Sequence, residues 1–202
     1  PYTLEVCVDS TASALAAMQG GAHRLELCAD LVIGGTTPSL ALLQQVKAET
    51  GLPVRALLRP RFGDFCYDRW ELAQMVQSAA RLVEAGADGI VTGVLTTEGD
   101  WDVDALQPIY AAARAAAQRA GRPVACTLHR AFDVCRDPFA ALEAARALGL
   151  STILTSGQAP SAPEGAALLT RLVEAAGPEL EILVGAGVPP ETLPALDAAT
   201  GA

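Results

Sequence analysis

Leu4-Glu5-Val6-Cys7-Val8-Asp9 and Leu25-Glu26-Leu27-Cys28-Ala29-Asp30 repeat a single pattern, Leu-Glu-x-Cys-x-Asp. In an extended strand, successive side chains point to opposite faces, so the Glu, Cys and Asp of each copy share one face. The apolar residues of each copy share the other face. If the two strands are neighbours, thiols and carboxylates meet at one end of a sheet, which predicts a metal or catalytic site there.

Strand-like and helix-like stretches alternate along the whole chain, separated by Gly, Pro or Asp. The strand-like runs lie near 4–8, 24–28, 53–59, 89–95, 123–129, 152–156 and 181–185, and the helix-like runs near 10–19, 39–50, 69–85, 103–120, 137–148, 163–176 and 189–199. Helix starts are marked by Ser10, Ser39, Asp137-Pro138 and Val188-Pro189-Pro190. This alternation predicts an α/β fold of seven βα units.

Polar residues inside the predicted strands decide between the two common folds with parallel βα units, the closed (β/α)8 barrel and the open, doubly wound sheet. Glu5, Cys7, Arg59 and His129 alternate with apolar residues, whereas a doubly wound strand is covered on both faces and is almost continuously hydrophobic. We therefore predict a (β/α)8 TIM-type barrel, with residues 1–202 forming a single domain that covers seven βα units. The eighth unit is expected to be missing or open, which leaves the domain incomplete at the C-terminal end.

Composition narrows the class of ligand. The chain has 202 residues, a net charge of −9 and a pI near 4.6, and it has no Lys/Arg run that would follow a phosphate backbone. We expect no nucleic acid and no membrane partner, since no apolar run reaches the roughly 18 residues of a membrane span. Five cysteines in a chain of this size favour free thiols in a reducing compartment. The sequence thus predicts a soluble, cytoplasmic protein with a small ligand, and it allows a homo-oligomer.

Ionisable residues gather at the predicted C-terminal ends of the strands, where barrels bind and react. One interpretation is an enzyme acting on a small anionic substrate, a carboxylate or a phosphate. In that interpretation Glu5, Glu26 and His129 are the catalytic acids and bases. The donors to the anion are Arg59, Arg61, Arg130 and Ser156. The structural alternative is an ion-pair network in which Glu5 and Glu26 face Arg59, with Arg55 and Arg61 as further candidate partners, because unpaired charge in an interior is costly.

Longer phrases carry a family resemblance. They are LELC followed by GGTTPSL (34–40), RPRFGDFCY (59–67), GADGIVTGVL (86–95), HRAFD (129–133), LTSGQ (154–158) and GAGV (185–188). From Leu4 to about Val188 the chain resembles the CutC family, which is associated with copper homeostasis. It departs from the family pattern at Thr36, Phe62 and Leu128. The resemblance implies a barrel fold, a cytoplasmic location and a copper(I) role for Cys7 and Cys28.

The copper interpretation agrees with the chemistry of the two thiols. Thiolates select soft Cu(I), and adjacent strands lie about 4.8 Å apart, so two inward sulfurs can hold one ion. Because neighbouring strands of a barrel contribute to alternate layers, Cys7 and Cys28 are expected to be staggered along the axis. The alternatives are two buried core thiols without a metal, or the enzyme described above.

Overall fold

The computed structural model describes residues 2–202 and divides them into two compact units, one built from 3–92 and 104–125 and the other from 93–103 and 126–202, with Tyr2 grouped with the second. The seven predicted strands and seven predicted helices are all present, and the strand order follows the chain from β1 to β7. No eighth strand is found within residues 2–202. The predicted α/β class with the sequential strand order of a TIM-type barrel is therefore confirmed.

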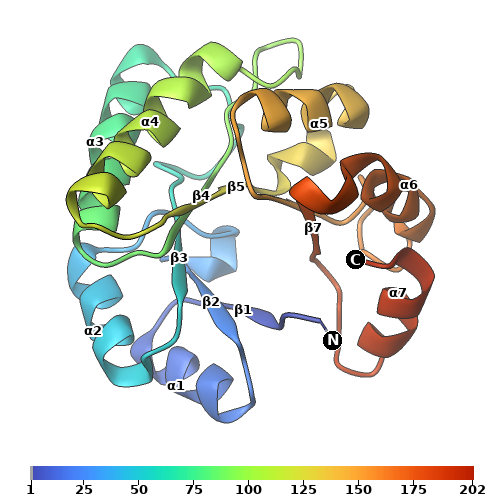
Figure 1. Cartoon of the computed structure of the whole chain (residues 1–202), viewed down its shortest axis with the longest axis horizontal. Coiled ribbons are helices and arrows are strands. Elements are labelled where there is room, and N and C mark those ends of the chain that lie inside the picture. Colours follow the sequence, from blue (N-terminus) through green and yellow to red (C-terminus); the bar gives the residue numbers. More distant parts are fainter. Residues whose placement is uncertain (1) are drawn as a thin grey trace. The chain divides into compact units, whose positions relative to one another are not determined.

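The first unit is a parallel sheet of four strands with helices between them. Its elements are β1 (Glu5–Val8), α1 (Thr11–Gln19), β2 (Arg24–Leu27), the 3-10 helix η1 (Leu31–Ile33), α2 (Leu40–Thr50), β3 (Val54–Leu57), α3 (Arg69–Glu84), β4 (Gly89–Thr92) and α4 (Val103–Arg119). Figure 1 shows helices α1 to α4 outside strands β1 to β4. The pairs β1·β2, β2·β3 and β3·β4 are all parallel.

The second unit continues the same pattern. Its elements are β5 (Ala125–Leu128), the 3-10 helix η2 (Arg130–Val134), α5 (Pro138–Ala147), β6 (Thr152–Thr155), α6 (Ala166–Ala176), the 3-10 helix η3 (Gly177–Glu179), β7 (Glu181–Val184) and α7 (Leu193–Thr200). The first residue of β5, Ala125, is grouped with the first unit. Strand β6 pairs in parallel with β5 and with β7.

Side-chain oxygens fix where several helices begin. The Ser10 hydroxyl accepts a hydrogen bond from Ser13 N (3.1 Å), and Ser39 Oγ accepts one from Leu42 N (3.1 Å). Asp137 caps α5, with Pro138 in the first turn. These caps satisfy backbone donors that have no partner within the helix, so the predicted starts of α1, α2 and α5 are confirmed.

The register of β1 and β2 places the repeated phrase. Cys7 lies opposite Glu26 across the ladder, and Val8 lies opposite Leu27. Leu25 and Leu27 are fully buried, and Cys28 forms a buried apolar cluster with Leu57 and Val91. The two copies of the phrase are therefore parallel neighbours, as the sequence predicts.

No helix among residues 2–202 has the length and apolar character needed to cross a bilayer.

Candidate functional site

The two cysteines of the repeat lie side by side at the carboxyl ends of β1 and β2. Their sulfurs are 4.0 Å apart. Because Cys7 pairs with Glu26 in the ladder, Cys28 lies two residues further along the neighbouring strand, so the predicted stagger is present. Cys7 is exposed and Cys28 is fully buried, so the pair has one open side and one covered side.

Both thiols have weak hydrogen-bond partners. Cys7 Sγ lies 3.9 Å from Glu26 Oε1, and Cys28 Sγ lies 3.6 Å from the carbonyl oxygen of Val8. The hydrogen bond shared with Cys28 raises the pKa of Cys7, and desolvation by the surrounding protein raises it further. Cys7 is therefore a protonated thiol in the metal-free protein, and a metal that binds there must displace that proton.

Glu26 is a buried carboxyl beside this thiol. Burial raises its pKa well above the ordinary value, and the neighbouring Cys7 and Glu5 raise it further, while Arg55 opposes the shift. The carboxyl therefore retains its proton more strongly than a free glutamic acid. When protonated, it is a neutral neighbour of Cys7 and a poor metal ligand.

Glu5 has two cationic partners, of which Arg55 is among the candidates that the sequence offers and Arg24 is not. Its carboxylate pairs with Arg24 Nε and lies 3.7 Å from Arg55 Nη1. The prediction that Arg59 pairs with Glu5 or Glu26 is wrong. Arg24 lies opposite Glu5 on the neighbouring strand β2, and Arg55 lies opposite Glu26 one strand further, on β3. Both are on the face that the alternation assigns to the glutamates, so they reach the carboxylate of Glu5.

Arg59 is buried and bonds to backbone carbonyls instead. Its Nη1 lies 3.2 Å from the carbonyl oxygens of Gly34 and Gly35, and its Nη2 lies 2.9 Å from that of Gly63. The guanidinium also stacks over the ring of Phe65, 5.0 Å from its centroid. Among residues 2–202 no carboxylate lies within salt-bridge distance of it, so this cation is held by dipoles and an aromatic face.

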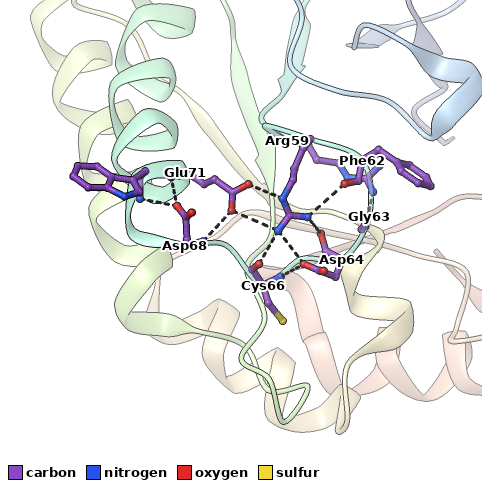
Figure 2. Close-up of polar contacts among 9 residues, drawn as sticks. Arg59, Phe62, Gly63, Asp64, Cys66, Asp68 and Glu71 are labelled. Atoms are coloured by element: carbon purple, nitrogen blue, oxygen red, sulfur yellow. Dashed lines mark hydrogen bonds and ion pairs between the residues drawn. The ribbon is translucent and has the colours of Figure 1, made fainter.

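Arg61 stabilises the loop between β3 and α3. Its Nε donates to Glu71 Oε1 (2.5 Å), and its Nη2 donates to Asp64 Oδ1 (3.1 Å) and to the carbonyl of Cys66 (2.8 Å). Figure 2 shows Asp64, Cys66 and Glu71 gathered around this network. The charge of Arg61 is therefore neutralised locally, which weakens the prediction that it binds an anionic substrate.

Asp133 organises the corresponding cluster in the second unit. Its carboxylate accepts hydrogen bonds from Thr155 Oγ1 (2.5 Å), Ser156 N (3.0 Å) and Gln158 N (3.2 Å), and it pairs with Arg130 Nε (2.8 Å). Arg130 Nη2 also lies 3.3 Å from Ser156 Oγ. The structure thus brings the predicted anion donors Arg130 and Ser156 together. The backbone donors of this turn, however, already hold a carboxylate of the protein itself.

His129 is buried at the end of β5, and its ring orientation is fixed. Its Nδ1 accepts a hydrogen bond from Ala131 N (3.1 Å), so the neutral ring carries its proton on Nε2. A Cβ on Gly93 would lie 2.7 Å from this ring and 2.8 Å from Trp101, so only glycine fits there. His129 is thus a hydrogen-bond donor through Nε2, and Nδ1 is not available as a base.

The sequence reasoning missed Arg24, although Arg24 lies two positions before Glu26 in the same strand and its shared face was a readable signal. Asp133 follows Arg130 closely in the sequence and pairs with it as its position predicts. Its contacts with Thr155, Ser156 and Gln158 had no such signal, because they depend on how the η2 and β6 turns approach each other. Within residues 2–202 no group of three or more His, Cys, Asp or Glu side chains is arranged to hold a metal ion, which leaves the two thiols as the candidate ligands.

Comparisons with known proteins agree on one family. The model of the CutC family matches residues 2–202. A CutC family protein of Chromobacterium violaceum is 48% identical over 198 residues, which cover 98% of this chain and 77% of that protein. A human protein named copper homeostasis protein cutC homolog is 42% identical over 202 residues, which cover 100% of this chain and 71% of that protein.

Solved structures extend the comparison to the fold. The crystal structure of a protein named CutC from Streptococcus agalactiae superposes with a TM-score of 0.89 at 30% identity, covering 99% of this chain and 95% of that one. The structure of 2,3-dimethylmalate lyase has a TM-score of 0.69 at 14% identity, covering 98% of this chain and 73% of that one. This second likeness shows a shared fold alone.

Proposed function

The chain belongs to the CutC family, and from this premise we propose that it is a copper-homeostasis protein that binds Cu(I) between Cys7 and Cys28. The observation that supports the proposal is the 4.0 Å separation of the two sulfurs. A metal–thiolate bond is about 2.3 Å long, so one ion bound to both sulfurs spans up to about 4.6 Å between them. The observed pair fits that span without a change in either strand.

The chemistry of the surroundings favours Cu(I) over harder ions. Soft thiolates select Cu(I), whereas Mg²⁺ and Ca²⁺ require several oxygen ligands. The nearest carboxyl is that of Glu26, 3.9 Å from Cys7 Sγ, and burial raises its pKa well above the ordinary value, so it retains its proton more strongly than a free glutamic acid. Structural zinc sites use four ligands, and two thiols supply only half of that number.

A cytoplasmic location is part of the proposal. All five cysteines are free thiols, and free thiols persist in a reducing compartment. Copper homeostasis appears in the name of the human relative, and here it is assigned to this chain by its membership of the family.

Anaerobic Cu(I) competition with a chromogenic chelator tests this function. We expect tight binding in the wild type and a large loss of affinity in Cys7→Ser, Cys28→Ser and the double variant, because a single soft ligand holds Cu(I) poorly. Affinity also falls as pH is lowered, since protons compete for the thiolates. Cys66→Ser is the matched control, because Cys66 lies in the loop before α3. Wild-type affinity in the double variant would refute the proposal.

A second candidate function is an enzyme that acts on a small carboxylate or phosphate held by Arg130 and Ser156, with His129 of the same unit as a proton donor through Nε2. The observation that favours it is the contact between Arg130 and Ser156, with 45% of the Arg130 side chain exposed to solvent. Calorimetry with oxalate and with inorganic phosphate, on the wild type and on Arg130→Met, tests it. Heat of binding that is lost in the variant supports the enzyme, and equal heats in both proteins count against it.

A further inference from the structure

A short segment covers the buried member of the thiol pair. Residues Asp30–Gly35, called the strap here, follow β2 and include η1. Gly35 adopts a φ of +84°, and a Cβ built on it would lie 3.3 Å from Cβ and 3.5 Å from Sγ of Cys28. The strap backbone therefore packs against Cys28 and, together with Leu57 and Val91, buries that thiol, while Cys7 stays exposed.

Apolar burial does not hold the strap in place. Its three large apolar side chains are exposed, Leu31 by 40%, Val32 by 95% and Ile33 by 43%. The base of the strap is closed by the pair of backbone hydrogen bonds between Ala29 and Thr36, at 2.9 and 2.8 Å. The position of the segment beyond that base therefore depends on polar contacts.

Arg59 provides those contacts from underneath. One guanidinium nitrogen donates to the carbonyls of both Gly34 and Gly35, and another donates to Gly63 in the next loop. The cation is itself fixed by the ring of Phe65. Hydrogen bonds from a charged donor are stronger than those from a neutral donor. The bond to Gly35 is buried, where a hydrogen bond contributes more than it does in water, and the bonds to Gly34 and Gly63 are partly buried.

We propose that the strap is a gate over Cys28 and that Arg59 holds it closed. The inference rests on the proposed function only in taking Cu(I) as the ion that passes the gate. Cys7 offers the first ligand to an arriving ion without any rearrangement. The second ligand becomes available when the bonds of Arg59 to Gly34 and Gly35 break and the strap lifts from Cys28. Arg59 is thus a positioning residue, not a metal ligand.

The test is the alkylation rate of each cysteine by iodoacetamide in the metal-free protein, followed by peptide mass spectrometry. In the wild type, Cys28 should react slowly, because the strap covers it. In Arg59→Met, Cys28 should react on the order of tenfold faster, because opening no longer breaks two charge-assisted hydrogen bonds. Removal of a nearby cation lowers the thiolate fraction of a cysteine, so a faster reaction must come from access.

Two further variants make the result decisive. Arg61→Met is the matched control, since this arginine of the same loop contacts Glu71 and Asp64 and does not touch the strap. Its Cys28 rate should equal that of the wild type. Gly34→Ala loosens the contact while Arg59 is kept, because a Cβ there would lie 3.3 Å from Arg59 Nη1 at a φ of +90°. It should accelerate Cys28 even if Arg59→Met fails to fold.

Several outcomes would overturn the gate. They are a wild-type Cys28 rate equal to that of the urea-unfolded protein, an unchanged Cys28 rate in both Arg59→Met and Gly34→Ala, or equal acceleration in Arg61→Met. Since alkylation is measured without copper, failure of the gate leaves the Cu(I) competition result intact. A lack of copper binding, in turn, leaves the alkylation result intact.

Discussion

At the scale of single residues, the protonated carboxyl of Glu26 has a measurable effect on stability. Its pKa is raised by burial and by its neighbours, so the folded protein holds a proton that the unfolded chain releases above about pH 4.3. This contribution to stability is fully present below that pH. It is lost as the pH rises through the raised pKa of the folded state.

We therefore predict that Glu26→Gln removes this pH dependence. The free energy of unfolding of the variant should rise relative to the wild type with increasing pH, by up to about 1.4 kcal/mol per pH unit. Urea unfolding of the metal-free proteins between about pH 5 and about pH 8 measures it. Glu84→Gln, which alters a surface pair with Arg119, is the control and should run parallel to the wild type. Parallel curves for Glu26→Gln would show that this carboxyl is ionised in the fold.

The face of the sheet on which each strand side chain lies could be predicted from the sequence. The contact partners of those side chains could be predicted only in part. Alternation along a strand was enough to place Cys7, Cys28 and Glu26 on one face. It gave Arg55 and Arg59 the same face as well, and so it did not decide which of them meets Glu5. The strap decided this, because the carbonyls of Gly34 and Gly35 lie where Arg59 would otherwise extend, and loop conformation has no periodic signal.

At the scale of elements, Asp133 holds the end of β6 against η2. The Asp133→Ala variant leaves the hydroxyl of Thr155 and two backbone donors without their acceptor, and Arg130 without its carboxylate. We expect a loss on the order of 3 kcal/mol in the free energy of unfolding, measured in urea. Added formate should restore part of the lost free energy of unfolding by occupying the position of the missing carboxylate. The surface variant Asp197→Ala is the control, and formate should not stabilise it. An Asp133→Ala variant as stable as the wild type would contradict this account.

The start of α3 gives a smaller and cleaner prediction. The Asp68 carboxylate accepts hydrogen bonds from Trp70 N (2.7 Å) and Glu71 N (2.8 Å), and Asp68 N donates to Glu71 Oε2 (2.9 Å). Figure 2 shows this cap next to the loop that Arg61 holds. Asp68→Ala should cost about 1 kcal/mol in thermal or urea unfolding, whereas Asp68→Asn, another good cap, should cost much less. Equal losses in the two variants would point to charge instead of capping.

Helix boundaries show where sequence patterns fail. The predicted helices at 163–176 and 189–199 begin later, at Ala166 and Leu193. A Cβ on Gly165 would lie 1.9 Å from the carbonyl oxygen of Ser156, so the approach of a distant turn sets the start of α6. Pro189 accepts a turn hydrogen bond from Thr192 N, and Pro194 takes the first turn of α7 instead. Several prolines fit a helix start equally well, and tertiary contacts select among them.

At the scale of the whole molecule, the proposed metal should act on stability through one unit. Cu(I) bound only to the folded state stabilises by about 2.7 kcal/mol at a free concentration a hundredfold above its dissociation constant. We expect a higher unfolding midpoint with Cu(I) in the wild type and no change in the double Ser variant of Cys7 and Cys28. Slower hydrogen exchange should be confined to β1, β2 and the strap. Protection spread evenly over β5 to β7 would argue against this site.

The two-residue offset between Cys7 and Cys28 also determines how the site responds to oxidants. With Cys7 opposite Glu26, the α-carbons of the two cysteines are about 8 Å apart, from strand spacing and rise. Disulfide bridges rarely form beyond about 7 Å without backbone movement. An oxidant therefore reaches the exposed Cys7 first, and the raised pKa of that thiol slows its oxidation, while Cys28 stays covered by the strap. A dithiol site built this way loses its ligands one at a time, and a cellular thiol can restore it without breaking an internal cross-link.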